Sequence, residues 1–236
     1  MAGTAPLRTD DIRLRMDRMY RPQKYFYDVT RKYYLLGRDR LIGELDARPG
    51  QSVLDIGCGT GRNLALIGRR YPATRLFGLD AAAPMLELAG RRLQRAAVRA
   101  SLARGVAEEL DPLALFGERH GFDHVTISYC LSMVDDPEAA VRAAAGVLLP
   151  GGTLHIVDFG DMAKLPGWFR KAMVGWLARF HVRHKPVVEP TLRALADTDG
   201  GTVQTIEIAR RYAMLLRLAC GNSGSRLRSR GRSGTG

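Results

Sequence analysis

The 236-residue sequence has only three cysteines, Cys58, Cys130 and Cys220, and no two of them form a CxxC pair. Neither a disulfide-stabilised fold nor a cysteine zinc site is therefore indicated, and we predict no bound metal. The sequence also lacks an uninterrupted run of about 18 apolar residues, the length that a membrane-spanning helix requires. Charges interrupt the N-terminal stretch before any apolar run, so we expect no secretory leader and a reducing, cytoplasmic environment.

Acidic residues are scarce in the last third of the sequence. Residues 162–236 contain 14 Lys and Arg against 4 Asp and Glu, which accounts for +10 of the net charge of +12. Such a surface attracts an anionic partner, which could be a membrane, a nucleic acid or an acidic protein. Charge alone does not choose among these, and a solvated basic surface explains it equally well.

Short apolar runs alternate with longer helical stretches through the middle of the chain, which is typical of an α/β fold with a parallel sheet and crossover helices. The length favours one principal domain. The sequence LLPGG at 148–152 is expected to end a helix before the next strand. We predict strands at 52–56, 75–80, 101–107, 124–129 and 153–159, helices at 62–70, 84–99, 110–120 and 137–149, and two late antiparallel strands within 202–218.

The composition divides the chain into three parts. Residues 1–48 are expected to form a helical region that covers the ligand edge of the domain. Residues 49–220 form the main domain, with an amphipathic insertion at 162–186. Residues 221–236 are rich in Gly, Ser and Arg and have almost nothing to bury, so we expect a disordered basic tail.

The stretch VLDIGCGTGRN joins the first predicted strand to the first predicted helix. Its glycines, Gly57, Gly59 and Gly61, allow a sharp turn and a close approach of the backbone to a ligand. Asp80 ends the second predicted strand, where its carboxylate can accept hydrogen bonds from both hydroxyls of a ribose. The spacing GxGxG differs from the GxGxxG that binds a dinucleotide pyrophosphate. Turns and helix caps alone use the same residue types, but the ordered set indicates a nucleoside site.

The segment Asp55-Ile-Gly57-Cys-Gly59-Thr-Gly61 resembles the first motif of class I S-adenosylmethionine-dependent methyltransferases. The resemblance runs over about residues 50–160. It implies a Rossmann-like, mostly parallel seven-stranded sheet with helices on both faces, and S-adenosyl-L-methionine as the cofactor. It also implies that the three glycines line the methionine and ribose part of the cofactor, that Asp55 orders their loop and that Asp80 holds the ribose. The alternative is a nonenzymatic or dinucleotide-binding relic of the same layout.

The same resemblance assigns the adenine side of the site. Ala107 and Glu108 fall where the family contacts adenine, and Met85 is placed to cover the adenine face. Many relatives have Asp where this chain has Val106, so a side-chain contact to the adenine amino group is not expected there. A backbone contact from Ala107 is unaffected by this difference.

Tyrosines are concentrated just ahead of the predicted domain. Methyl transfer mainly requires alignment and exclusion of water, and tyrosine rings can stabilise the cations involved. Tyr27, Tyr33 and Tyr34 are expected near the open ends of the strands, where ligands bind in such sheets. Packing of this segment on the sheet would explain the tyrosines without a ligand.

Four stretches resemble the bacterial diacylglyceryl-homoserine N-methyltransferases over about residues 16–218. They are YRPQKYFYDVTRKYYLLGRDRLI, SYCLSMVDDP, VDFGD and LPGWFRKAMVGWLARFHV. The resemblance implies that the amine of a lipid is methylated three times to give a trimethylated betaine lipid. We expect Tyr27, Asp28, Tyr33 and Tyr129 to contact the acceptor or the sulfonium. Arg38 or Arg40 is a candidate for binding a carboxylate, and His181 and His184 either join a headgroup pocket or lie on the basic surface.

Residues 165–180 form an amphipathic helical pattern in which Arg170 and Lys171 lie off the apolar face. Such a helix can rest in a membrane interface or cover a substrate. The basic excess favours contact with an anionic membrane, so we expect a cytoplasmic protein that lies on the inner face of the membrane. The residues grouped on the apolar face are Leu165, Phe169, Ala172, Met173, Trp176 and Phe180.

Three alternative functions remain. A phosphatidylethanolamine N-methyltransferase and a methyltransferase for a quinone or another small molecule would share the cofactor site. A basic nucleic-acid-binding module is a distant alternative, because the sequence lacks a recognisable RNA-binding motif or an aromatic platform. We therefore expect no specific nucleic-acid partner.

Overall fold

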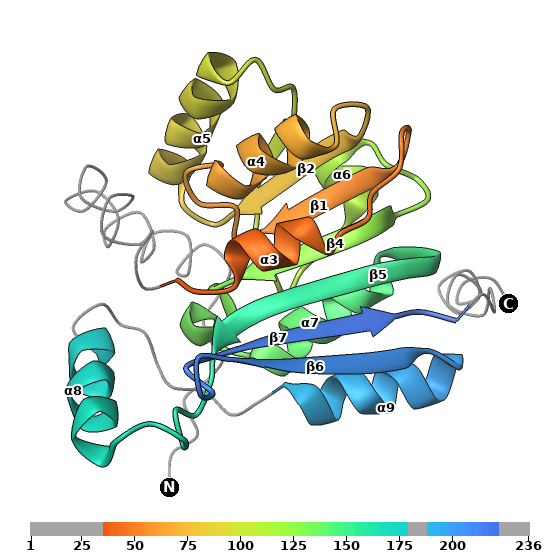
Figure 1. The fold of residues 1–236 in the computed structure, drawn as a ribbon. Helices are drawn as coiled ribbons and strands as arrows, with labels where there is room; N and C mark the ends of the chain where they lie inside the picture. The colour runs from red at the N-terminus through yellow and green to blue at the C-terminus, as the bar shows by residue number, and fades with distance from the viewer. Residues whose placement is uncertain (1–34, 179–187, 222–236) are drawn as a thin grey trace, which may run out of the picture.

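The structure, a computed structural model, describes residues 35–178 and 188–221. A seven-stranded sheet forms its centre, in the order β3-β2-β1-β4-β5-β7-β6 (Figure 1). The first five strands are parallel, whereas β7 is antiparallel to both β5 and β6. The predicted α/β class and the mostly parallel seven-stranded sheet are confirmed. The strands are β1 (Ser52–Ile56), β2 (Arg75–Asp80), β3 (Ser101–Arg104), β4 (Phe122–Ser128), β5 (Leu148–Phe159), β6 (Thr202–Ile208) and β7 (Ala213–Ala219).

Helices cover both faces of the sheet (Figure 1). On one face, α3, α4 and α5 share an apolar cluster with Val53 and Val157. On the other face, α6, α7 and α9 pack with Leu54 and Ile127 in a second cluster. The central strands are buried on both sides, and their sequences are therefore continuous apolar runs. The helices are α3 (Arg38–Gly43), α4 (Arg62–Arg70), α5 (Ala83–Arg95), α6 (Pro112–Phe116), α7 (Pro137–Gly146), α8 (Gly167–Ala178), α9 (Glu189–Asp199) and the 3-10 turn η1 (Leu131–Met133).

Several predicted boundaries differ from the structure. LLPGG does not end a helix: α7 already ends at Gly146, and β5 begins at Leu148 because Leu148 pairs with Phe122 of β4. Strand β3 is shorter than predicted and ends at Arg104. Helix α6 is also shorter, because the Asp111 carboxylate caps its start and Gly117 ends it in a left-handed conformation, with a φ of 74°.

The amphipathic helix predicted within residues 165–180 is α8, which follows β5 (Figure 1). Phe169, Met173 and Trp176 are partly buried against the α3 and α4 side of the core, as helical spacing predicts. Ala172 is exposed, contrary to its grouping with them, and Phe180 lies outside the described residues. No helix among the described residues combines the length and apolar character needed to cross a bilayer.

Two buried histidines, His124 of β4 and His155 of β5, flank the hydroxyl of Thr153. The Thr153 hydroxyl is 2.8 Å from Nδ1 of His124 and 3.0 Å from Nε2 of His155. His155 is fully buried, and its Nδ1 has no hydrogen-bond partner in the structure. Burial, with a smaller effect of Arg217 and then of His124, lowers the pKa of His155 to about 3. The ring of His155 is therefore held neutral in the folded protein near pH 7, and burial also lowers the pKa of His124.

Replacing His155 with asparagine should flatten the dependence of stability on pH. Below pH 6.5 the unfolded chain binds a proton at this histidine and the folded protein does not, so the wild-type protein loses stability as pH falls. Between pH 7 and pH 4.5 this one group should cost about 2 to 3 kcal/mol. Urea unfolding at both pH values measures the effect. An equal loss of stability in wild-type and His155→Asn proteins would contradict the assignment.

Candidate active site

The candidate site lies at the carboxyl ends of the parallel strands, where β1 has β2 on one side and β4 on the other. The crossovers leave β1 in opposite directions at this point, which opens a crevice for a ligand in sheets of this kind. The loops after the five parallel strands, β1 to β5, lie at this edge. The residues predicted to bind a ligand can be located on them one by one.

The glycine loop after β1 adopts a conformation that side chains would oppose. Gly57, Gly59 and Gly61 have φ values of 67°, 53° and 72°. A Cβ on Gly57 would lie 2.4 Å from the Sγ atom of Cys130, whereas the position of a Cβ on Gly59 is open space. The loop thus exposes its backbone at Gly59, and α4 begins directly after it. This is the cradle that the methionine and ribose end of S-adenosylmethionine requires.

Asp80 lies at the end of β2, beside this loop. Its carboxylate accepts a hydrogen bond from the Gly59 N–H at 2.7 Å and from the Ala82 N–H at 2.9 Å. Each carboxylate oxygen has more than one lone pair, so both can still accept hydrogen bonds from ribose hydroxyls. Asp80 therefore connects the loop to the position at which the ribose is expected.

Asp55 is buried near the end of β1, just before the glycine loop. The Thr126 hydroxyl donates a 2.7 Å hydrogen bond to its carboxylate. Burial raises the pKa of Asp55 to about 6, although Thr126, the positive charge of Arg38 and Asn63 each lower it. Arg38 donates from Nε and Nη2 to the Asn63 amide oxygen at 3.2 and 3.0 Å. Arg38 thus lies at the site, whereas Arg40, the other predicted candidate, pairs with Glu44 on the exposed side of α3.

The residues assigned to adenine lie along the loop after β3. Ala107 and Val106 are buried, and the Glu108 carboxyl is partly buried, which raises its pKa. Met85 is 1% exposed at the start of α5, where Met133 packs on it. Met85 is therefore a buried packing residue in the structure. Its contact with the adenine face remains a prediction.

Tyr129 directly follows β4, which ends one residue earlier than predicted; it has a left-handed φ of 52° and is buried. Its hydroxyl donates a 2.5 Å hydrogen bond to the carbonyl oxygen of Leu36, so it anchors the segment that precedes α3. The ring meets Phe159 edge-on at 4.8 Å, and Phe159 meets Tyr212 at 6.0 Å. The ring of Tyr129 thus belongs to an aromatic cluster, while its hydroxyl is already engaged.

Asp158 is a site residue that was missed from the sequence. It ends β5 beside the aromatic cluster and accepts backbone hydrogen bonds from Phe159 and Ser132 at 2.8 and 3.2 Å. Burial raises its pKa to about 6. The signal that singled out Asp80, an acidic residue where a parallel strand ends, would also have found Asp158.

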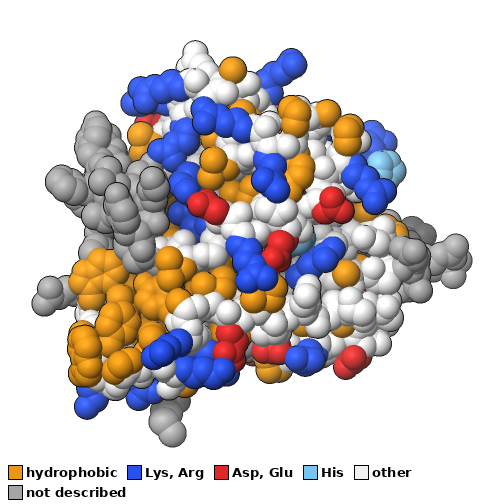
Figure 2. Space-filling model, viewed as in Figure 1, with side chains coloured by type: hydrophobic (Ala, Val, Ile, Leu, Met, Phe, Trp, Pro, Cys, Tyr) orange, Lys and Arg blue, Asp and Glu red, His pale blue; other side chains and the backbone are white. Residues whose placement is uncertain are grey.

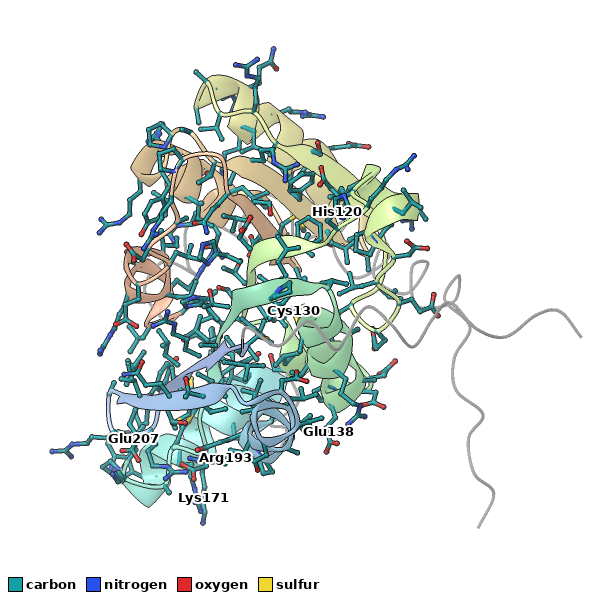
Figure 3. All side chains as sticks on the ribbon, turned by 90° about the vertical axis from the view of Figure 1, so that its right-hand side faces the viewer. His120, Cys130, Glu138, Lys171, Arg193 and Glu207 are labelled. Carbon is teal, nitrogen blue, oxygen red and sulfur yellow. The ribbon has the colours of Figure 1, made fainter. Side chains whose placement is uncertain are left out.

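Negative charges converge on Cys130, which lies in the middle of the molecule (Figure 3). Burial raises the pKa of its thiol, and the carboxylates of Asp80, Asp158, Glu108 and Asp55, in decreasing order, raise it further. Cys130 is therefore held as a neutral thiol and is no nucleophile. The site is electronegative although the protein is strongly basic, which suits a positively charged ligand.

The other predicted contacts cannot be placed. Tyr27, Asp28 and Tyr33 lie outside the described residues, as do His181 and His184, so their roles remain predictions. Within residues 35–178 and 188–221, no group of three or more His, Cys, Asp or Glu side chains could hold a metal ion.

Comparison with known proteins supports this geometry. Residues 53–152 match the family described as "Methyltransferase domain". An uncharacterized methyltransferase of Mycobacterium tuberculosis is 35% identical over 121 residues, which cover 51% of this chain and 57% of that protein. The 2-phytyl-1,4-naphtoquinone methyltransferase of Trichormus variabilis is 31% identical over 157 residues, covering 64% of this chain and 66% of that one. The chain thus matches less than two thirds of the length of either relative.

A solved structure shows the same fold at low sequence identity. The phosphoethanolamine N-methyltransferase 2 of Haemonchus contortus, in complex with phosphomonomethylethanolamine and S-adenosylhomocysteine, superposes with a TM-score of 0.65. It is 15% identical, and the match covers 92% of this chain and 60% of that one. The match of residues 53–152 to the methyltransferase domain family, the strand order and the glycine loop agree with one another, and together they support a methyltransferase domain that uses S-adenosylmethionine.

Proposed function

We propose that the protein is an N-methyltransferase that converts the amine of diacylglyceryl homoserine to the trimethylated betaine. The observation that carries this proposal is the buried carboxylate of Asp158 near the end of β5, whose charge acts on Tyr129, a residue that itself meets Phe159 edge-on. A carboxylate next to aromatic faces suits an ammonium group, through charge and through the ring quadrupoles.

S-adenosylmethionine supplies an electrophilic methyl group, and the residues of the chain must present an unprotonated amine to it. The amine arrives mostly as an ammonium ion near neutral pH. Asp158 attracts this ion and can accept its proton, because a carboxyl group with a pKa of about 6 is a stronger base than an exposed aspartate. The amine lone pair then forms the N–C bond as the S–C bond breaks, and the electron pair stays on sulfur.

The surface around α8 suits a lipid acceptor. Trp168 is 74% exposed and Val174 is 40% exposed, with Arg170 and Lys171 exposed beside them. Figure 2 shows apolar side chains gathered at the lower left, where α8 lies, with Lys and Arg along their border. Lys171 points away from the body of the protein (Figure 3). An apolar patch bordered by cations is the pattern of a helix that rests on an anionic membrane.

Replacing Trp168 with alanine should weaken binding to anionic lipid vesicles about 10-fold without unfolding the protein, since the ring is largely outside the core. Vesicle sedimentation measures the effect. Leu113→Ala is the matched control, because Leu113 is 56% exposed on α6, away from α8. Equal binding by the Trp168→Ala and Leu113→Ala variants would show that α8 does not contact the membrane.

A quinone acceptor is the second candidate, supported by the naphtoquinone methyltransferase relative at 31% identity. One assay separates the two functions. The purified protein is incubated with a labelled methyl donor and, in parallel, with diacylglyceryl homoserine, phosphatidylethanolamine and demethylmenaquinol in detergent. Mono-, di- and trimethyl products from the homoserine lipid alone support the proposal. Methylation of the quinol alone, or of phosphatidylethanolamine alone, overturns it.

A further inference from the structure

A groove lined by arginines lies between α4 and α5, on the far side of the glycine loop from Asp80, with Arg62 and Arg92 next to that loop. It has a volume of about 420 Å³. In Figure 2, Lys and Arg side chains gather at the upper left of the molecule, where α4 and α5 lie. The lining residues are Arg62, Ala65, Leu66 and Arg69 of α4, Arg92 and Arg95 of α5, and Ala96.

The spacing along the two helices explains why four guanidinium groups share this groove. Arg62 and Arg69 are seven residues apart, which is about two helical turns, so both lie on the same face of α4. Arg92 and Arg95 are three apart and lie on the facing side of α5. Ala65, Leu66 and Ala96 provide a small apolar floor against which the arginine stems can lie.

Acidic side chains among the described residues do little to neutralise Arg62, Arg69 and Arg95. Arg62 is 3.1 Å from Asp39, which is 78% exposed, so this ion pair is weak. Arg92 donates a hydrogen bond to the Thr60 hydroxyl at 3.2 Å. Among the described residues, Arg69 and Arg95 have no carboxylate within 4.0 Å, whereas Arg91 and Arg142 pair with glutamates one turn away on their own helices. Like charges held this close repel one another unless an anion binds between them.

We propose that this groove binds the phosphate group of an anionic ligand, either a phospholipid headgroup or a free phosphate ester. The guanidinium fork matches phosphate oxygens with two parallel hydrogen bonds, and several such forks around one group favour phosphate over a single carboxylate. The volume falls in the range of small-molecule sites and exceeds what one ion fills. This inference does not depend on the identity of the methyl acceptor.

The test compares the full-length protein with an Arg69→Gln/Arg95→Gln variant. Three probes are used: vesicles of phosphatidylglycerol with phosphatidylcholine, vesicles of phosphatidylcholine alone, and inorganic pyrophosphate. The control variant, Arg91→Gln/Arg142→Gln, loses the same net charge from exposed helix positions outside the groove. Circular dichroism and thermal melting confirm that both variants fold.

The groove variant should bind its ligand about 10- to 30-fold more weakly than the control variant. Loss of binding to phosphatidylglycerol vesicles alone identifies a headgroup, and loss of binding to pyrophosphate identifies a free phosphate ester; either supports the proposal. The affinity of an Arg69→Lys/Arg95→Lys variant should lie between those of the wild type and the glutamine variant, because lysine keeps the positive charge but lacks the forked guanidinium group. Equal losses in the groove and control variants, or no binding of any probe by the wild type, would overturn it.

Discussion

Replacing Asp80 with alanine should weaken S-adenosylmethionine binding by at least about 100-fold, because two charge-assisted hydrogen bonds to the ribose are lost. The loop is affected as well, since Asp80 accepts the Gly59 N–H at 2.7 Å and the Ala82 N–H at 2.9 Å. Isothermal titration with S-adenosylhomocysteine measures the change directly and does not depend on knowing the methyl acceptor.

Asp111→Ala is the matched control for this prediction. Asp111 also accepts two backbone N–H groups, those of Leu113 and Ala114, but it does so at the start of α6. Its loss should cost about 1 kcal/mol of stability through the helix cap and leave cofactor affinity unchanged. Wild-type affinity in Asp80→Ala, or equal losses of affinity in both variants, would show that Asp80 does not hold the ribose.

Replacing Asp158 with asparagine should lower kcat/KM for an amine acceptor by about 100- to 1,000-fold while leaving cofactor binding intact, because the proton acceptor is lost. In the wild-type protein, kcat/KM should rise with pH through an inflection near 6, as the buried carboxyl loses its proton. The variant should lack this inflection. A pH profile of methylation for both proteins is the measurement.

The same substitution should stabilise the fold at neutral pH. The pKa of Asp158 is raised from 3.8 to about 6, so between these values the folded protein retains a proton that the unfolded chain has lost. The folded state is therefore disfavoured as pH rises through this window, and the charged carboxylate remains a cost above it. The Asp158→Asn substitution would remove that cost but also one backbone hydrogen bond, for a net gain of about 1 to 2 kcal/mol.

Asp161→Asn is the control for both effects. Asp161 lies three residues further along and forms an ion pair with Arg211, with its side chain 36% exposed. It should change neither the pH profile nor cofactor binding. If Asp158→Asn methylated an amine as fast as the wild type, the acceptor carboxylate would have to be another group.

Much of the cofactor site was predictable from local patterns. Gly57, Gly59 and Gly61 do adopt left-handed φ values, and Asp80 does end β2 beside them. The φ values depend on the turn itself, so spacing along the chain predicts them, whereas Asp80 reaches Gly59 because β1 and β2 are paired. The helix boundaries at LLPGG were wrong because pairing between Leu148 and Phe122 extends β5 through a proline and two glycines.

The sequence by itself determined the α/β class, the glycine loop and the acidic strand end, because each follows from hydrophobic periodicity or from the φ angles that glycine allows. Tertiary structure alone decided which distant groups meet. It brought Asp158 of β5 to Tyr129 of β4, tied the Tyr129 hydroxyl to Leu36, and aligned four arginines from α4 and α5 in one groove. These tertiary contacts depend on strand order and helix packing, and neither is encoded by the spacing within any single segment.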